Sequence, residues 1–195
     1  MSLTIIDRTA ETAGITHNLS GIQILTRASD TTRELSRINA IVLHQMNFSR
    51  GGDVTLYDTV IAHYAVLTDG SVLQLRPLTD ILNDAHSGPG VEIEFASPVG
   101  GYPSVQRIRR GAAERPHHVQ IEAGRKLVEH IRGLFPSNLR FIYSHQQFNP
   151  TVKGNCPGPH LWYNIGEWAK LKFALRSEGV SNSIPAAWTD SSLAC

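Results

Sequence analysis

The run Ile38-Asn39-Ala40-Ile41-Val42-Leu43-His44 (INAIVLH) is nearly continuously apolar and has the length of one β-strand. A strand that is apolar on both faces is typical of the interior of a sheet that is covered on both sides, as in α/β proteins. The run ends on His44, and an imidazole at the end of a buried strand needs a polar partner. We therefore predict an α/β fold whose sheet carries His44 at a strand end.

Several other segments carry the patterns of strands and helices. Thr68-Asp69-Gly70-Ser71 lies between two β-rich runs, which predicts a hairpin. After Pro116, apolar residues recur every three or four positions as far as Leu134, which predicts a helix with one buried face. The predicted strands are 38–44, 63–67, 72–75, 91–95 and 139–143, and the predicted helices are a short one at 55–62, one that follows Pro116 and one at 162–175. These elements suit a mixed central sheet flanked by helices.

Length and composition are those of one globular domain. The chain has 195 residues, of which 41% are hydrophobic and 18% charged, and its formal net charge is +1. This balance gives no general attraction to nucleic acid or to an anionic membrane, and no stretch has the roughly 18 apolar residues that span a bilayer. We expect an irregular lead-in at 1–30 with one short strand at 21–25, the main domain at 31–176, and a loosely packed C-terminal tail at 177–195.

The N-terminal residues MSLTIIDRTAETAG contain no basic region followed by an apolar run, so no signal peptide is predicted. Two cysteines cannot supply a disulfide framework. Cys156 lies in a loop and Cys195 at the end of the chain. We expect a protein made in a reducing cytosol.

The segment Ser144–Trp162 (SHQQFNPTVKGNCPGPHLW) brings together side chains that bind metals. The predicted strand 139–143 leads directly into His145, and Cys156 lies in a stiff Cys-Pro-Gly-Pro turn. A catalytic zinc ion needs three protein ligands and an open position, and His44, His145 and Cys156 satisfy that requirement. Each of them alone also fits an ordinary role, as a hydrogen-bonded structural histidine or a small buried hydrophobe, and their spacing along the chain is not specific.

Metal-assisted hydrolysis also needs a general base and a cation that holds a developing oxyanion. Glu92 follows two glycines and lies on the predicted strand 91–95, among apolar residues that favour a raised pKa. The alternation of that strand puts Glu92 and Glu94 on one face, so an exposed strand face is the alternative interpretation. Lys153 lies between two of the proposed ligands, and its alternative is a solvated loop residue.

Four segments, taken in order, resemble the zinc-dependent N-acetylmuramoyl-L-alanine amidase family. They are IVLHQM, AHYAVLTDGSVLQLRP, GPGVEIEF and YSHQQFNPTVKGNCPGPHLW, and the resemblance covers residues 38–172. This family includes phage amidases, bacterial cell-wall recycling amidases and animal peptidoglycan recognition proteins. The resemblance implies an α/β domain with a zinc groove at the strand ends, and it is closest to the recycling branch.

The resemblance also implies roles for particular residues. His44, His145 and Cys156 match the three zinc ligands of the family. Glu92 matches the catalytic acid/base of the recycling branch, and Lys153 matches the lysine that stabilises the tetrahedral intermediate. Further positions are His86, where relatives place a substrate-contacting histidine, His63, for which we expect an internal structural role, and His160, a rival ligand that we rank below Cys156.

Two departures from the family pattern bear on these roles. Phage-type members carry a catalytic tyrosine where this chain has Ala62, which favours a mechanism that uses Glu92. Between the lysine and the third ligand the family has one residue, whereas this chain has Gly154 and Asn155. The extra residue changes the spacing between Lys153 and Cys156, so the distance of Lys153 from the proposed ligands depends on the conformation of this loop.

The resemblance implies hydrolysis of the amide between N-acetylmuramic acid and L-alanine, in peptidoglycan or in soluble muropeptides, by a monomer that needs Zn²⁺. One alternative is a peptidoglycan-binding module without catalysis, and another is a zinc amidase that acts on a different amide. We expect no nucleic-acid or membrane partner. The setting stays open between a cytoplasmic recycling enzyme, a phage endolysin released by a holin, and a toxin delivered to a cell wall by a dedicated secretion system.

Overall fold

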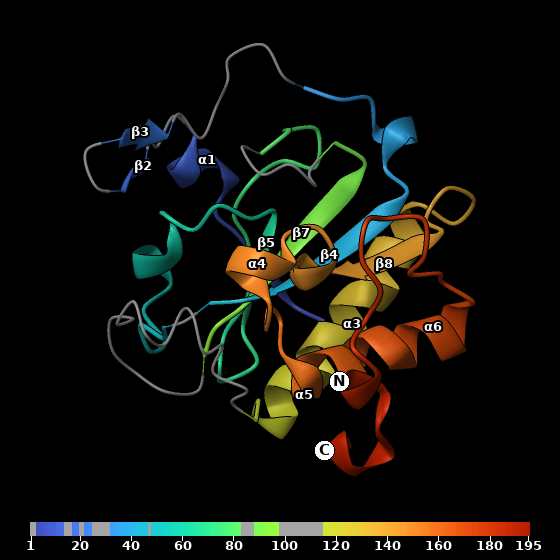
Figure 1. Cartoon of the computed structure of the whole chain (residues 1–195). Coiled ribbons are helices and arrows are strands. Elements are labelled where there is room, and N and C mark those ends of the chain that lie inside the picture. Colours follow the sequence, from blue (N-terminus) through green and yellow to red (C-terminus); the bar gives the residue numbers. More distant parts are fainter. Residues whose placement is uncertain are drawn as a thin grey trace.

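The computed structural model describes residues 3–13, 17–19, 22–24, 32–46, 48–82, 88–97 and 115–195, and a mixed sheet runs through its middle (Figure 1). The strand order is β1-β6-β5-β7-β4-β8, and only the β5–β6 pair is antiparallel. The strands are β1 (Ile5–Asp7), β4 (Ala40–Gln45), β5 (Tyr64–Val66), β6 (Val72–Gln74), β7 (Gly90–Phe95) and β8 (Phe141–Ser144). The predicted α/β class with a mixed sheet is confirmed, as are the five predicted strands and the hairpin between β5 and β6.

Strand β4 has a neighbour on each side, β7 and β8, and runs parallel to both. Its residues Ala40 to Leu43 are at most 1% exposed, as the apolar run predicts. The register pairs Val42 with Glu92 and His44 with Glu94, so these four side chains share one face of the sheet. The opposite face carries the apolar side chains of β4 and β7.

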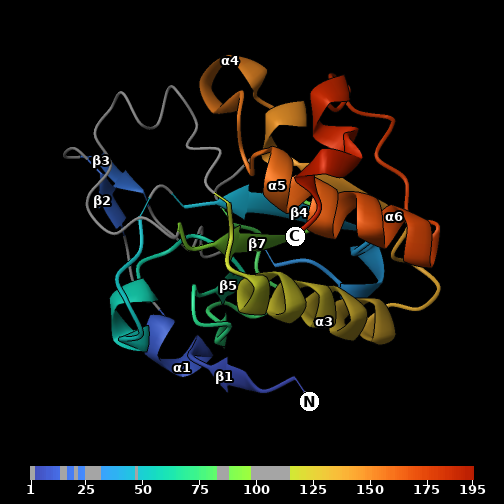
Figure 2. The same ribbon diagram turned by 90° about the horizontal axis from the view of Figure 1, so that it is seen from below.

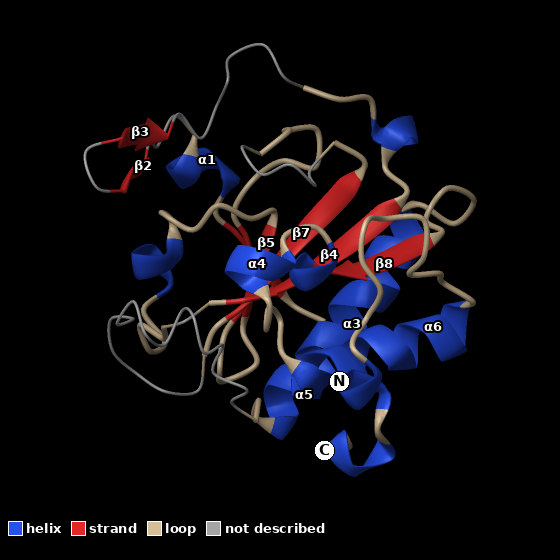
Figure 3. Cartoon of the chain, viewed as in Figure 1, coloured by secondary structure: helices blue, strands red, loops and turns tan. Residues whose placement is uncertain are grey.

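That apolar face is covered by two long helical segments, which Figures 2 and 3 show together on one side of the strands. They are α3 (His118–Leu134) and a continuous segment made of a π-helical part (Trp162–Glu167) and α6 (Trp168–Phe173). Both helices predicted after Pro116 and at 162–175 are thereby confirmed. At Gly124 of α3, a Cβ atom would lie 2.7 Å from side-chain atoms of Phe95 and Ile165, so the absence of a side chain lets the three elements meet closely.

The face that carries Glu92 and Glu94 is covered by shorter elements. A second buried cluster lies here beneath residues 48–62, and it includes Met46, Tyr57 and Ala65. Only one 3₁₀ turn, Val54–Tyr57, forms where a short helix is predicted at 55–62. The other short elements are α4 (Pro150–Lys153), α5 (Pro159–Leu161) and 3₁₀ turns at Leu35–Arg37, His145–Gln147, Ala186–Thr189 and Ser191–Leu193.

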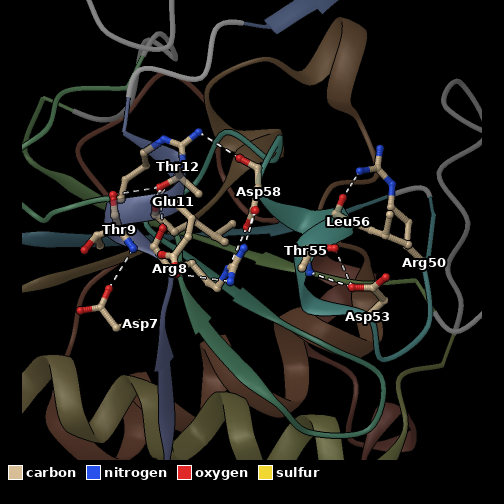
Figure 4. A network of polar contacts seen from close by, with 12 residues as sticks. Asp7, Arg8, Thr9, Glu11, Thr12, Arg50, Asp53, Thr55, Leu56 and Asp58 are labelled. Atoms are coloured by element: carbon tan, nitrogen blue, oxygen red, sulfur yellow. Dashed lines mark hydrogen bonds and ion pairs between the residues drawn. The ribbon is translucent and has the colours of Figure 1, made fainter.

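The N-terminal segment is more regular than its sequence pattern predicts. β1 pairs in parallel with β6 and becomes an edge of the main sheet, and α1 (Thr9–Thr12) follows. Arg8 fixes this segment through a two-bond ion pair with Asp58, at 3.0 and 2.6 Å, within the polar network of Figure 4. The expectation of an irregular lead-in is therefore wrong for β1. The expected strand at 21–25 is present as β3 (Ile22–Ile24), which pairs with β2 (His17–Leu19) outside the main sheet.

The C-terminal segment is packed against the domain rather than loose. Trp188 is only 5% exposed and belongs to the core cluster beneath α3. Gln147 donates to the carbonyls of Ser177 and Asn182 at 2.7 and 3.2 Å. The expectation of a loose tail is wrong, because one aromatic side chain and a few backbone bonds suffice to hold a polar segment.

Among the described residues, no helix combines the length and the apolar composition that a membrane span requires.

Candidate metal centre

Two histidines meet at the carboxyl ends of β4 and β8. His44 is the fifth residue of β4, and His145 follows β8 directly. Because the two strands are parallel neighbours, these ends lie at the same edge of the sheet. The Nδ1 atoms of the two rings are 2.8 Å apart, and the residues are 3% and 7% exposed. The structure thus brings together two side chains that are 101 positions apart in the sequence.

Cys156 reaches the same place from the loop that follows α4. The backbone N–H of Gln45 donates to its Sγ at 3.4 Å, and the backbone N–H of Gln146 donates to its carbonyl at 2.9 Å. Since Gln45 and Gln146 each follow one of the two histidines, both histidine segments hold Cys156. The ligand atoms of His44, His145 and Cys156 all lie within 4.8 Å of one another.

This donor set fits a zinc ion. Two imidazole nitrogens and one thiolate sulfur are ligands that zinc prefers, and three protein ligands leave a fourth position for a reactant. A tetrahedral zinc ion holds two imidazole nitrogens about 3.3 Å apart. The two rings would separate by only about half an ångström to reach that spacing.

Glu92 fixes the orientation of His44 from the side away from His145. Its Oε2 contacts Nε2 of His44, and the carboxylate is almost fully buried, at 1% exposure for the residue. Burial acts to lower the pKa of His44, but the charge of Glu92 and contacts with Cys156 outweigh it and raise that pKa well above its ordinary value. In the neutral ring, the contact with Glu92 places the proton on Nε2, which leaves the lone pair of Nδ1 facing the other candidate ligands. Carboxylates behind metal-binding histidines commonly play this part.

A second buried histidine positions Glu92. Nδ1 of His63 accepts the backbone N–H of Glu92 at 3.0 Å, while its Nε2 lies 3.1 Å from the carbonyl of Asp80. Burial and the nearby charge of Arg33 lower the pKa of His63 to about 3, so the ring is neutral. The internal structural role predicted for His63 is confirmed.

Two residues near the site have no role in the sequence-based interpretation. Oε1 of Glu94 lies 3.9 Å from Nδ1 of His44, and the signal for this closeness was the shared face of Glu92 and Glu94. Arg33 is 4% exposed and donates to the carbonyls of Leu78, Gly88 and Gly90 at 2.8–2.9 Å, which supports the start of β7. No sequence signal marks Arg33, because the backbone carbonyls and the His63 ring that it contacts, at 3.1 Å from Nη2 to Nε2, are distant in the sequence.

The remaining predicted residues have different outcomes. Lys153 ends α4 and its side chain lies outside the described part of the structure, as does the whole of His86. The ring of His160 lies 3.4 Å from the carbonyl of Leu193, so the structure groups it with the C-terminal segment and not with His44. Ala62 is fully buried in the second core cluster, as befits a position without a catalytic hydroxyl.

Comparison with known proteins adds solved structures of similar fold. No protein-family model matches the sequence, and no curated protein sequence does. An endolysin N-acetylmuramoyl-L-alanine amidase, LysCS from Clostridium intestinale, is 15% identical with a TM-score of 0.52, over 90% of this chain and 99% of that one. Drosophila peptidoglycan recognition protein SD is 15% identical with a TM-score of 0.55, over 91% and 99%.

A third similar structure is the ectodomain complex of peptidoglycan recognition proteins LCa and LCx with bound tracheal cytotoxin. It is 18% identical with a TM-score of 0.54, and the match covers 90% of this chain and 100% of that one. At these identities the likeness concerns the fold alone. The chain therefore has the fold that amidases and peptidoglycan recognition proteins share.

Proposed function

We propose that the protein is a zinc-dependent amidase that hydrolyses the bond between N-acetylmuramic acid and L-alanine in peptidoglycan or muropeptides. The observation that carries the proposal is the convergence of His44, His145 and Cys156 at one sheet edge. Its support is the fold shared with an endolysin of that named activity. A peptidoglycan fragment is accordingly the partner that we propose.

The proposed division of labour follows from the contacts of each side chain. His44, His145 and Cys156 would hold zinc, which when bound supplies Lewis-acid chemistry toward a carbonyl and lowers the pKa of water. Glu92 uses one oxygen to hold His44, whereas its buried Oε1 has no hydrogen-bond partner in the described structure. An orphaned carboxylate oxygen beside the ligands supports the proposed acid/base role of Glu92.

The proposed role of Lys153 is to hold the oxyanion that develops during amide hydrolysis. Its backbone closes α4, three residues before Cys156. Gly154 lies next to it, and a Cβ there would be 2.7 Å from the carbonyl oxygen of Pro150. The two residues between Lys153 and Cys156 are thus taken up in a tight turn, and this compactness is compatible with a lysine near the metal centre. His86 stays a proposed substrate contact.

A peptidoglycan-binding module without catalysis is the second candidate. The similar structures include a complex of recognition proteins with tracheal cytotoxin, so this fold serves binding in those proteins. The presence of all three donor residues in one place favours the enzyme, because a binding groove by itself needs no thiolate between two imidazoles.

The test begins with the metal content of the purified protein and a matched pair of variants. We expect about one zinc per chain, and we expect Cys156→Ala to weaken zinc binding by more than about 100-fold, since it removes a ligand. Cys195→Ala removes the other thiol, which is exposed and free, and should leave zinc binding unchanged. Equal zinc binding by both variants would place the metal elsewhere.

The second stage measures release of peptide stems from muropeptides and from intact sacculi, with and without a chelator. An amidase releases stems only in the zinc-loaded state. Binding of the fragments without any release by the zinc-loaded protein would identify the module instead. A preference for soluble muropeptides over sacculi would favour a recycling role.

A further inference from the structure

A hollow lies at the opposite ends of the strands that carry the candidate metal centre. Its volume is about 600 Å³. Asn39, which lines it, precedes β4, and Arg140, which also lines it, precedes β8, whereas His44 and His145 lie at the carboxyl ends. His44 lies five positions after Asn39 in extended chain, which spans roughly 16 Å. The hollow is therefore a separate site, lined by Arg33, Ser36, Arg37, Asn39, Ile81, Gly88, Pro89, Asn138, Arg140, Phe141 and Arg176.

The hollow concentrates positive charge. Four arginines line it, while no Asp or Glu is among the described residues of its lining. The chain as a whole has a net charge of only +1, with 18 basic and 17 acidic side chains. Guanidinium groups that face one space repel each other, and an anion bound in that space offsets this electrostatic repulsion. The local excess of charge is therefore a property of this site and not of the whole surface.

The backbone beneath the arginines is tied together by hydrogen bonds. The N–H of Arg140 donates to the carbonyl of Asn39 at 2.8 Å, and the N–H of Arg176 donates to the carbonyl of Arg140 at 2.9 Å. Asn138 donates through its side chain to the carbonyl of Ser36 at 3.0 Å. The segments that contain Asn39, Arg140 and Arg176 are thus hydrogen-bonded to one another beneath the hollow. A binding site that is already ordered before the ligand arrives has a lower entropic cost of binding.

Two of the four guanidinium groups are available to a ligand. Arg33 is engaged by backbone carbonyls, and Arg176 lies over the ring of Phe141 and 3.5 Å from Glu178. Arg37 and Arg140 are exposed, and within the described structure their side chains make neither a hydrogen bond nor an ion pair. Each therefore offers a planar set of N–H donors that suits an oxyanion.

We infer that this hollow binds a phosphate-bearing ligand through Arg37 and Arg140, with Arg33 and Arg176 adding to the positive field. A phosphate monoester carries a charge of about −1.5 to −2 at neutral pH, against −1 for a carboxylate. A phosphate therefore compensates the clustered charge better than a single carboxylate does. Its oxygens also accept from two guanidinium groups at once. The ligand is a free phosphate or a phosphate ester, and the volume leaves room for the ester's organic part.

Calorimetric titration of the intact protein tests this inference, at constant ionic strength and without zinc, so that its result is independent of the proposed amidase activity. The probes are inorganic phosphate, pyrophosphate, glycerol 3-phosphate, and malonate as a dicarboxylate of similar charge. We expect the phosphate compounds to bind more tightly than malonate. The strongest of the three phosphate probes then identifies the free ion, the polyphosphate or the ester as the preferred form.

The variants are Arg37→Gln and Arg140→Gln, and each should weaken phosphate binding about tenfold, as loss of one charge-assisted contact does. Neither arginine side chain makes a hydrogen bond or an ion pair in the described structure, so the unfolding free energy should not change. Lys126→Gln is the control, because it removes one positive charge outside the hollow. An equal loss in Lys126→Gln, equal binding of malonate, or no binding of any phosphate probe overturns the inference.

Discussion

His44 has its two ring nitrogens in different environments. Nε2 contacts the buried carboxylate of Glu92, and Nδ1 faces His145. The contact with Glu92 leaves the lone pair of Nδ1 available in the neutral ring, and the sulfur of Cys156 and the ring of His145 lie close enough to complete the proposed zinc ligand set. The chemistry proposed for this site thus depends on a carboxylate whose contact with His44 only the structure shows.

Glu92→Gln separates the two roles proposed for Glu92. The amide oxygen still accepts from Nε2 of His44, so zinc affinity should fall by no more than about tenfold. The amide cannot accept a proton, so turnover should fall by about 10²- to 10⁴-fold. Metal analysis and the rate of stem release measure the two effects.

Glu94→Gln is the matched control, because Glu94 lies on the same strand face and 3.9 Å from His44. It should reduce turnover less than Glu92→Gln does. The reverse order, with Glu94→Gln inactive and Glu92→Gln active, would assign the proton transfer to Glu94.

His63 makes the stability of the fold depend on pH. Its pKa is about 3 in the folded protein and 6.5 in the unfolded chain. Between these values the unfolded chain binds a proton that the folded protein does not. This contribution to the free energy of unfolding is therefore complete above pH 6.5 and is lost as the pH falls toward 3, by at most about 1.4 kcal/mol per pH unit.

Denaturant unfolding at pH 7 and pH 4 measures this effect in the parent protein and in His63→Gln, whose amide can keep the bonds to Glu92 and Asp80. The difference in stability between the two proteins should shrink at pH 4. His130→Gln, a change of an exposed histidine, should leave the pH dependence as it is. If the unfolding free energies of the parent and of His63→Gln differ by the same amount at both pH values, His63 is not the source of the pH dependence.

At the scale of elements, three parallel strands set the positions of both sites. β4 and β8 present His44 and the start of the His145 turn toward their carboxyl ends, and Glu92 lies in the middle of β7. The arginine-lined hollow lies at the amino ends of the same strands. The helix layer of α3, the π-helical part and α6 packs against the other face of this sheet. At Gly124, α3 approaches Phe95 of β7, the strand that also carries Glu92.

Gly124→Ala tests that close approach. The new methyl group would lie 2.7 Å from atoms of Phe95 and Ile165, so the variant should lose about 1–3 kcal/mol of unfolding free energy through overpacking. Gly133→Ala in the same helix meets no atom within 4 Å and should gain up to about 1 kcal/mol from higher helix propensity. Denaturant titration measures both, and a gain in both variants would show that α3 has room to move away from β7.

At the scale of the whole molecule, the two ends of the chain complete the domain. β1 adds an edge strand to the sheet through β6. The C-terminal segment returns across the helix layer, where Trp188 enters the main core and Asn164 bonds to the carbonyl of Leu193 at 2.8 Å. The core is thus closed by a segment whose polar sequence gives little indication of packing.

Trp188→Ala should lower the unfolding free energy by about 3–5 kcal/mol, as expected for loss of a buried aromatic side chain. Leu171 is 87% exposed, and Leu171→Ala should change the unfolding free energy by less than about 0.5 kcal/mol. Equal stability of the two variants in a denaturant titration would mean that the C-terminal segment does not contribute to the core. Trp188→Phe should recover much of the loss.

The sequence by itself determined five central strands, the two long helical segments, the hairpin and the identity of three candidate metal ligands. These follow from local periodicity and residue chemistry, as in the apolar run that ends on His44 and the helix that follows Pro116. Only the tertiary structure decided that Glu92 contacts Nε2 of His44, that Trp188 enters the core, and that Arg37 and Arg140 share a hollow. Such pairings depend on strand register and on segments distant in sequence, and local pattern carries no information about either.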